Sequence, residues 1–254
     1  MIADLKEFAD LKGIKLKEQK EIAHIASDNI AHRFGYDKTQ IKENFDNLLE
    51  ETEKEAYKVY LGFEKSYGEE VFKVFVEQLI QSGEISELNQ LGTILGQYFR
   101  VFDKFYLSLA QSRKSRAGHS FENIHNALFK ELGYPFDEQR VINGKPDFIL
   151  PSYAHFKANP IDCIIFTAKR TLRERWRQIT TEGTRGLGFF LATIDDALTS
   201  TQLTEMHHNR IYIVCPENIK TAKYGDKVNV LSFKEFFLDH LDPAMERWRR
   251  NGII

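Results

Sequence analysis

Two adjoining stretches of the sequence decide the fold: Cys163-Ile164-Ile165-Phe166 and Ala168-Lys169-Arg170-Thr171-Leu172-Arg173-Glu174-Arg175-Trp176-Arg177. The first is short, apolar and rich in β-branched and aromatic residues, which is typical of a buried strand. The second has five basic residues in ten and begins as the strand ends. Because a protein core rarely holds a lysine unless it forms an ion pair or serves a function, we interpret Lys169 as functional. We expect a strand that turns at once into an arginine-rich helix, where a phosphate backbone is cut and bases are read.

The second half of the chain predicts short strands alternating with helices. A helix that begins near Ser120 should end at Gly133, because glycine often follows the last helical residue. Asn143-Gly144 is a strong tight-turn signal, and a further helix is expected over 171–181. The expected strands are 140–142, 146–150, 162–168, 189–194, 210–214 and 228–231. This pattern predicts a mixed sheet with flanking helices.

Residues 1–110 predict a helical N-terminal region that contributes to dimerisation and DNA contacts and belongs to the same domain as the core, 111–254. The basic segment 111–118 is polar and expected to be an exposed connection. The expected helices are 18–33, 37–55, 57–67, 70–81 and 88–110.

An aromatic stripe at helical spacing runs along the helix expected at 57–67. Its members are Tyr57, Tyr60, Phe63 and Tyr67. Two interpretations are open: the rings pack against the rest of the helical region, or one ring stacks on an unpaired or extruded base.

Charge and cysteine content narrow the function classes. The formal net charge is −2 over 254 residues, so nucleic-acid binding must come from local basic patches rather than overall attraction. Cys163 and Cys215 lie in apolar runs without CxxC spacing, which argues against a zinc site and favours reduced thiols. No apolar run approaches the roughly 20 residues of a membrane span. We expect a cytoplasmic protein with no membrane partner.

Asp147 and Lys169 are the residues that point to a chemical reaction. Asp147 follows Pro146 at the start of one expected strand and Lys169 ends the next, so their side chains can converge. An aspartate and a lysine on neighbouring strands is the pattern of metal-dependent nucleases of the PD-(D/E)XK type. Phosphodiester hydrolysis needs a hard divalent cation held by carboxylates, and a lysine can orient the attacking water and steady the developing charge.

One position of that pattern is altered. Thr167 stands two residues before Lys169, where an acidic residue is usual, and a threonine cannot replace a carboxylate as a metal ligand. Twelve residues separate Lys169 from Glu182. A helix packed across the strand ends could return Glu182 to the site, since the separation is about three helical turns. Glu122, after the basic segment, is a further acidic candidate.

The spacing of these residues resembles the CCGG-core family of Type II restriction endonucleases, of the EcoRII catalytic domain and PspGI type, over roughly residues 111–232. In that family the second metal carboxylate has moved from strand to helix, as Thr167 requires here. The resemblance implies an α/β (α+β) fold: a PD-(D/E)XK core with a mixed five-stranded sheet flanked by helices, plus the helical N-terminal region. It rests on Asp147, Lys169 and Glu182, on Lys169-x-x-x-Arg173-Glu174-Arg175, and on Arg116-Ala117-Gly118-x-x-x-Glu122.

The resemblance also implies the catalytic roles. Asp147 and Glu182 would hold Mg²⁺, Lys169 would be the catalytic lysine, and Glu122 would tune the site or its water.

For recognition, the resemblance implies that Arg173 and Arg175 donate to guanine and that Glu174 accepts from cytosine. These pairings also follow from the chemistry of the major groove. Gln111 would reach the minor groove. Basic residues contact phosphates more often than bases, and the expected backbone contacts are Arg113, Lys114, Arg116, Arg170 and Arg177.

Each residue also has a plain structural interpretation. Thr171-x-x-Glu174 is a capping box, Arg173 and Arg177 could form a solvated helix face, and Lys169 could extend from the sheet edge into water. Asp147 could be a turn residue and Glu182 a surface residue. Their joint occurrence at these spacings favours the functional interpretation.

We therefore expect a Type II restriction endonuclease, a site-specific deoxyribonuclease that uses Mg²⁺ to cut double-stranded DNA and leaves 5′-phosphates. A two-fold homodimer would read a CC(N/W)GG-type palindrome, with the central nucleotides flipped out. The cognate DNA methyltransferase would act on the same site without being a bound partner. Two alternatives stay open: another PD-(D/E)XK nuclease of repair or branched DNA, and a DNA-binding protein whose nuclease site is inactive.

Overall fold

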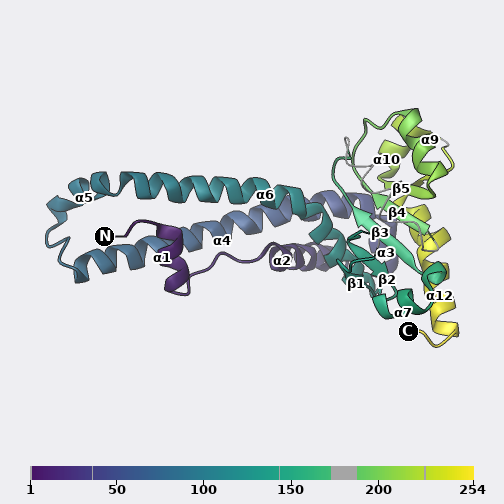
Figure 1. The fold of residues 1–254 in the computed structure, drawn as a ribbon, viewed down its shortest axis with the longest axis horizontal. Coiled ribbons are helices and arrows are strands. Elements are labelled where there is room, and N and C mark those ends of the chain that lie inside the picture. The colour runs from purple at the N-terminus through teal and green to yellow at the C-terminus, as the bar shows by residue number, and fades with distance from the viewer. Residues whose placement is uncertain (1, 36, 143, 173–187, 226) are drawn as a thin grey trace.

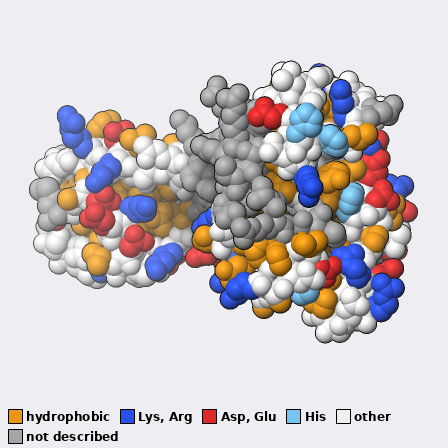
Figure 2. Space-filling model, turned by 45° about the vertical axis from the view of Figure 1, so that its right-hand side comes forward, with side chains coloured by type: hydrophobic (Ala, Val, Ile, Leu, Met, Phe, Trp, Pro, Cys, Tyr) orange, Lys and Arg blue, Asp and Glu red, His pale blue; other side chains and the backbone are white. Residues whose placement is uncertain are grey.

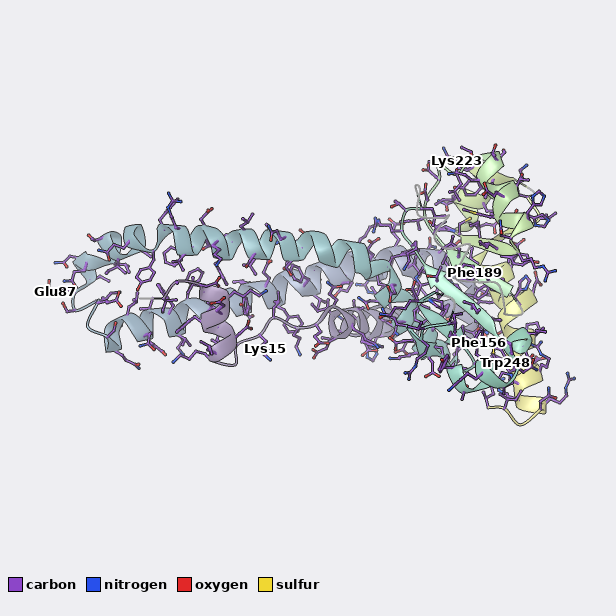
Figure 3. All side chains as sticks on the ribbon, in the orientation of Figure 1. Lys15, Glu87, Phe156, Phe189, Lys223 and Trp248 are labelled. Carbon is purple, nitrogen blue, oxygen red and sulfur yellow. The ribbon has the colours of Figure 1, made fainter. Side chains whose placement is uncertain are left out.

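The structure, a computed structural model, describes residues 2–35, 37–142, 144–172, 188–225 and 227–254, with the main chain only at 34 and 114–119. A long helical arm projects from an α/β body (Figure 1). The arm is formed mainly by α4 (Phe45–Gln81) and α6 (Phe99–Leu132). Glu87 lies at the far tip of the arm, and Phe189 and Trp248 lie in the body (Figure 3).

The length of α4 follows from its sequence. Its buried residues recur every third or fourth position, so one face stays inward along all 37 residues. At 1.5 Å per residue the helix spans about 55 Å. The helices expected at 57–67 and 70–81 are therefore parts of one helix, and the one expected at 37–55 is divided between α3 (Lys38–Glu43) and the start of α4.

The exposed connection expected at 111–118 is wrong, because α6 runs through it without a break. The segment has no proline and is rich in good helix formers, and Arg113 within it forms an ion pair with Glu64 of α4. Its polar composition therefore does not mark an end of the helix. α6 ends where predicted, at Gly133, whose φ of 77° is left-handed. The division proposed at 110/111 falls inside α6, so both parts of the chain share this helix.

Shorter helices complete the arm. An apolar core joins α1 to α4, α5 and α6 through residues such as Leu5, Phe75 and Phe105. On the face drawn in Figure 2, acidic and basic side chains are interspersed over the arm. The bounds are α1 Leu5–Leu11, α2 Gln19–Ala31, η1 His32–Phe34, η2 Leu88–Gln90 and α5 Leu91–Gln97.

The body is built on a mixed sheet of six strands in chain order. β1, β2 and β3 pair antiparallel, and β3 to β6 pair parallel. The predicted fold class is confirmed; the sheet has the six strands that the sequence pattern indicated, where the resemblance implied five. The strands are β1 Asp137–Glu138, β2 Phe148–Leu150, β3 Ile164–Ala168, β4 Gly188–Ala192, β5 Ile211–Cys215 and β6 Val230–Ser232.

The edge strand β1 lies earlier in the chain than the strand expected at 140–142. Asp137 pairs with Ile149 and Glu138 with Phe148. Gln139 then adopts a φ of 47° and turns the chain out of the sheet, so Val141 is left exposed. The apolar residues that suggested the strand thus lie beyond it.

Helices cover both faces of the sheet, which explains why β3 to β5 are near-continuous apolar runs. Alternate residues of β3 enter different cores: Phe166 packs with α6 and the C-terminal helices, and Ile165 packs with α9 and β5. The remaining elements are α7 Tyr153–Ala158, η3 Pro160–Asp162, α9 Ser200–His208, α10 Glu217–Ile219, η4 Lys220–Tyr224, α11 Phe233–Glu235, η5 Phe236–Leu241 and α12 Asp242–Arg250.

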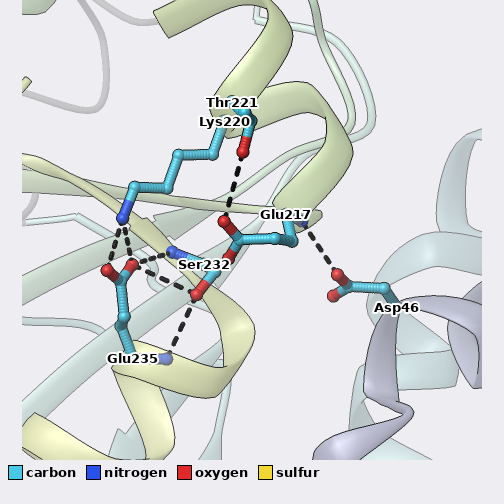
Figure 4. Close-up of polar contacts among 6 residues, drawn as sticks. All are labelled: Asp46, Glu217, Lys220, Thr221, Ser232 and Glu235. Atoms are coloured by element: carbon cyan, nitrogen blue, oxygen red, sulfur yellow. Dashed lines mark hydrogen bonds and ion pairs between the residues drawn. The ribbon is translucent and has the colours of Figure 1, made fainter. Parts of the chain in front are cut away.

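Polar contacts join the C-terminal segments to each other and to the arm (Figure 4). The Asp46 carboxylate at the start of α4 accepts the main-chain N–H of Glu217 at 2.8 Å. Burial raises the pKa of Asp46. Lys220 of η4 forms an ion pair with Glu235 of α11, which also accepts the N–H of Ser232 at 2.7 Å.

Both cysteines are free and buried, as their positions in apolar strands predicted. Burial raises the pKa of each thiol to about 12, so Cys163 and Cys215 are inert at neutral pH. Within the described ranges, no helix is apolar over enough residues to cross a membrane.

Candidate active site

Asp147 lies directly before β2, beside the end of β3. The pairing of Phe148 with Phe166 places it opposite Thr167. Asp147 is only 4% exposed. Its Oδ2 accepts the Thr167 hydroxyl at 2.7 Å, the Ala168 N–H at 2.8 Å and the Lys169 ammonium at 3.0 Å. The buried carboxylate is thus held by three consecutive residues of one chain segment.

Lys169 is brought to Asp147, as the sequence predicted. Its Nζ also donates to Oδ1 of Asp147 at 3.2 Å. The main-chain N–H of Lys169 donates to the carbonyl of Ala192 at 2.9 Å, which continues the pairing with β4. The lysine side chain is 34% exposed, so the site opens to solvent on the lysine side.

The carboxylate oxygens of Asp147 suit a hard divalent cation. Within the described part of the chain, Oδ2 of Asp147 accepts three donors, whereas Oδ1 accepts the longer lysine contact alone. Among the residues that the structure describes, no group of three or more His, Cys, Asp or Glu side chains could hold a metal. The second ligand that the sequence proposes, Glu182, lies outside the described residues.

Glu122 is connected to Asp147 through one residue, Gln139. The Gln139 side chain donates to the Glu122 carboxylate at 2.8 Å, and the Gln139 N–H donates to the Asp147 carbonyl at 3.0 Å. Sequence reasoning did not single out Gln139, because a lone glutamine gives no sign of the left-handed φ that aims its side chain toward α6.

His125, on the next turn of α6, is a core residue. It is fully buried, with aromatic contacts to Phe121 and Phe166. Its Nδ1 donates to the Phe121 carbonyl at 2.7 Å, and its buried Nε2 has no hydrogen-bond partner. Burial lowers its pKa to about 4, so it is neutral at pH 7.

The chain that leaves Lys169 is fixed to the loop after β4. The Thr193 hydroxyl donates to the Arg170 carbonyl at 3.3 Å, and the Leu172 N–H donates to Oδ2 of Asp195 at 2.8 Å. Leu172 itself is buried. Asp195 was not predicted, since an acidic residue after a strand carries no distinguishing signal. Five predicted residues lie outside the described ranges: Arg173, Glu174, Arg175, Arg177 and Glu182.

Two residues proposed to contact DNA phosphates have partners within the chain. Arg170 forms an ion pair with Glu53 of α4. Arg113 binds the buried carboxylate of Glu64, with its Nε at 2.9 Å and Nη2 at 2.7 Å. Gln111 is exposed on α6. The side chains of Lys114 and Arg116 are outside the description.

A cavity of about 560 Å³ lies between α2, α4 and α6, and Arg170 lines it. Tyr57 is 60% exposed and lines this cavity, whereas Tyr60 and Tyr67 are buried. Phe63 is half-buried with the Lys17 ammonium 5.3 Å from its ring centre. Of the four stripe residues, Tyr57 offers the most accessible ring beside the Lys169 segment.

Comparisons with known proteins show the family of the chain. The EcoRII C-terminal family matches residues 72–237. The Type II restriction enzyme SsoII of Shigella sonnei is 28% identical over 209 residues, which cover 78% of this chain and 67% of SsoII. The Type II restriction enzyme EcoRII of Escherichia coli is 32% identical over 153 residues; these cover 57% of this chain and only 37% of EcoRII.

Two solved structures share the fold. Metal-depleted Ecl18kI in complex with uncleaved, modified DNA has a TM-score of 0.67 and 25% identity, covering 97% of this chain and 84% of that one. The PspGI–substrate DNA complex has a TM-score of 0.61 and 20% identity, covering 91% of this chain and 94% of that one. Because the family match extends over more than half of the chain, including Asp147 and Lys169, the chain belongs to the EcoRII C-terminal family of Type II restriction endonucleases.

Proposed function

We propose that this enzyme is a homodimer that uses Mg²⁺ to hydrolyse double-stranded DNA at a CC(N/W)GG-type site and leaves 5′-phosphates. The observation that carries the proposal is the Asp147–Lys169 pair, with Nζ at 3.0 and 3.2 Å from the two carboxylate oxygens, in a chain of this family. A buried carboxylate beside a half-exposed lysine at a sheet edge suits phosphodiester chemistry.

In this proposal Asp147 and Glu182 are the residues that would hold Mg²⁺. When bound, the ion neutralises phosphate charge and makes a water more acidic. Lys169 keeps its ammonium group on the open side of the carboxylate, where it orients the attacking water and stabilises negative charge on the phosphate. Glu122 tunes the site through Gln139, which contacts both Glu122 and Asp147.

Bases are read from the segment that follows Leu172. Arg173 and Arg175 donate to guanine and Glu174 accepts from cytosine, while Gln111 reaches the minor groove. Arg113, Lys114, Arg116, Arg170 and Arg177 contact the backbone.

Two of these backbone contacts require an exchange of partners. To bind a phosphate, Arg170 would have to leave its ion pair with Glu53, and Arg113 its ion pair with Glu64. Both arginine side chains are about half exposed. Solvent-exposed ion pairs contribute only about 0–1 kcal/mol, so the exchange for Arg170 costs little. For Arg113 the exchange is harder, because the Glu64 carboxylate that it leaves is buried.

The central nucleotides of the site are flipped out, and Tyr57 is the ring on which one of them stacks. Support comes from its exposure and its place in the wall of a cavity that Arg170 also lines. The cavity volume of about 560 Å³ lies within the range of small-molecule pockets, and an aromatic ring stacks on any base.

Digestion of a plasmid of known sequence tests the proposal directly. With Mg²⁺ we expect discrete fragments whose ends map to CC(N/W)GG sites and carry 5′-phosphates. Methylation of those sites by the cognate methyltransferase, which acts on the same DNA in the cytoplasm, should block cleavage. Nicking without fixed ends would instead support a structure-specific nuclease, and binding without cleavage would support an inactive nuclease site.

A further inference from the structure

Thr167 occupies the position where metal-dependent nucleases of this pattern usually place an acidic residue. The side chain is fully buried, and its hydroxyl has a hydrogen-bond partner. It donates to Oδ2 of Asp147 at 2.7 Å, a length typical of a strong hydrogen bond from a hydroxyl to a carboxylate.

The contact acts together with that of the next residue. The Ala168 N–H reaches the same Oδ2 at 2.8 Å, so two donors from the rigid end of β3 fix one oxygen of the carboxylate. Rotation about the last bond of an aspartate side chain is otherwise broad and weakly restricted. Once Oδ2 is held on the β3 side, Oδ1 is directed to the side where, among the described residues, the Lys169 ammonium contacts it at 3.2 Å.

We propose that Thr167 is a positioning residue that locks the rotation of the Asp147 carboxylate and so presents Oδ1 to the divalent cation. This inference rests on the proposed function, because it assumes that Asp147 is a metal ligand. The threonine is therefore not a vacant ligand position; it replaces a second carboxylate by a donor. Partners that orient a metal ligand typically change metal affinity or activity by about 10–100-fold when they are removed.

Two substitutions separate the hydroxyl from the shape of the side chain. Thr167→Val keeps the volume and removes the donor, and Thr167→Ser keeps the donor and removes a methyl group. Thr167→Ala is a second hydroxyl-free variant, for use if the valine variant does not fold. Thr52→Val is the matched control, because Thr52 is fully buried in α4 and its hydroxyl has no hydrogen-bond partner among the residues that the structure describes.

The test is calorimetric titration of Ca²⁺ into the full-length protein bound to a CC(A/T)GG duplex, with thermal melting to confirm folding. We expect Thr167→Val and Thr167→Ala to bind Ca²⁺ about 10–100-fold more weakly, and Thr167→Ser and Thr52→Val to bind within about 3-fold of the wild type. The Mg²⁺ concentration for half-maximal cleavage should rise in Thr167→Val and Thr167→Ala and stay near the wild-type value in Thr167→Ser and Thr52→Val.

Unchanged Ca²⁺ affinity in both hydroxyl-free variants, or a serine variant as weak as the valine variant, would overturn the assignment of Thr167. Failure of the proposed function gives a different result: the wild type would not bind the duplex, or Asp147→Asn would bind Ca²⁺ as the wild type does. In that case Asp147 is not the ligand, whatever Thr167 does.

Discussion

At the scale of single residues, one carboxylate oxygen of Asp147 accepts three donors from a single chain segment, Thr167, Ala168 and Lys169. Asp147 and Lys169 could be found because residue type and strand position together are distinctive. The hydrogen bonds from Thr167 and Ala168 to Asp147 could not be predicted, since they depend on the register between β2 and β3. The role of Gln139 could not be predicted either, because it depends on a left-handed backbone conformation that glutamine does not favour.

His125 makes a residue-scale prediction about stability. Its pKa is about 4 in the folded protein, because burial disfavours the charged ring, and about 6.5 when unfolded. Between pH 4 and 6.5 the unfolded state therefore binds more protons. The free energy of unfolding therefore keeps its full value with respect to His125 above about pH 6.5. It falls as the pH drops toward 4, by about 3 kcal/mol in total.

Urea unfolding at pH 5 and pH 7.5 measures this effect. We expect the difference in unfolding free energy between the two pH values to shrink in His125→Leu. His208→Leu is the control, because His208 is exposed. An equal pH dependence in the wild type and in His125→Leu would show that His125 does not titrate as its burial requires.

At the scale of elements, hydrophobic periodicity predicted whether a segment is a helix or a strand better than it predicted where the segment begins and ends. Spacing of three and four identified α4 as helical but did not show that separate runs join into one helix. The polar segment 111–118 was expected to interrupt the helix because its composition resembles a loop, yet Arg113 binds Glu64 of α4 and the helix continues. The strand runs of the body were predicted well, since burial on both faces leaves near-continuous apolar sequence.

Asp195 links two elements and provides the prediction at this scale. Its two carboxylate oxygens accept the N–H groups of Leu172 and Ala197 at 2.8 and 3.0 Å. Asp195→Asn replaces one acceptor by a donor, so one of these bonds is lost. Because Leu172 precedes the proposed base-reading residues, we expect cleavage at the cognate site to fall and discrimination against sites with one changed base pair to fall by about 10-fold.

The measurement is cleavage rate on cognate and single-mismatch duplexes. Asp196→Asn is a matched control, because Asp196 is 59% exposed and contacts only Lys223 among the ion pairs seen, at 3.5 Å. If both variants lose rate equally on all duplexes, Asp195 supports the fold and has no part in recognition.

At the scale of the whole molecule, each chain supplies one Asp147–Lys169 pair, and cutting both strands of a duplex needs two. A palindromic site matches a two-fold dimer. We therefore expect light scattering to give twice the 29.6 kDa of the chain, and titration to give two chains per duplex. One chain per duplex, with both strands cut in a single binding event, would contradict the proposed dimer.

The most direct test of the central claim compares Asp147→Asn with the wild type on the same plasmid. Asparagine keeps the shape of the side chain but cannot supply the charge that a divalent cation needs. We predict that the variant still binds a CC(N/W)GG duplex and that Mg²⁺-dependent cleavage falls at least about 100-fold, while Asp196→Asn cuts normally. Cleavage by Asp147→Asn at the wild-type rate would contradict the account.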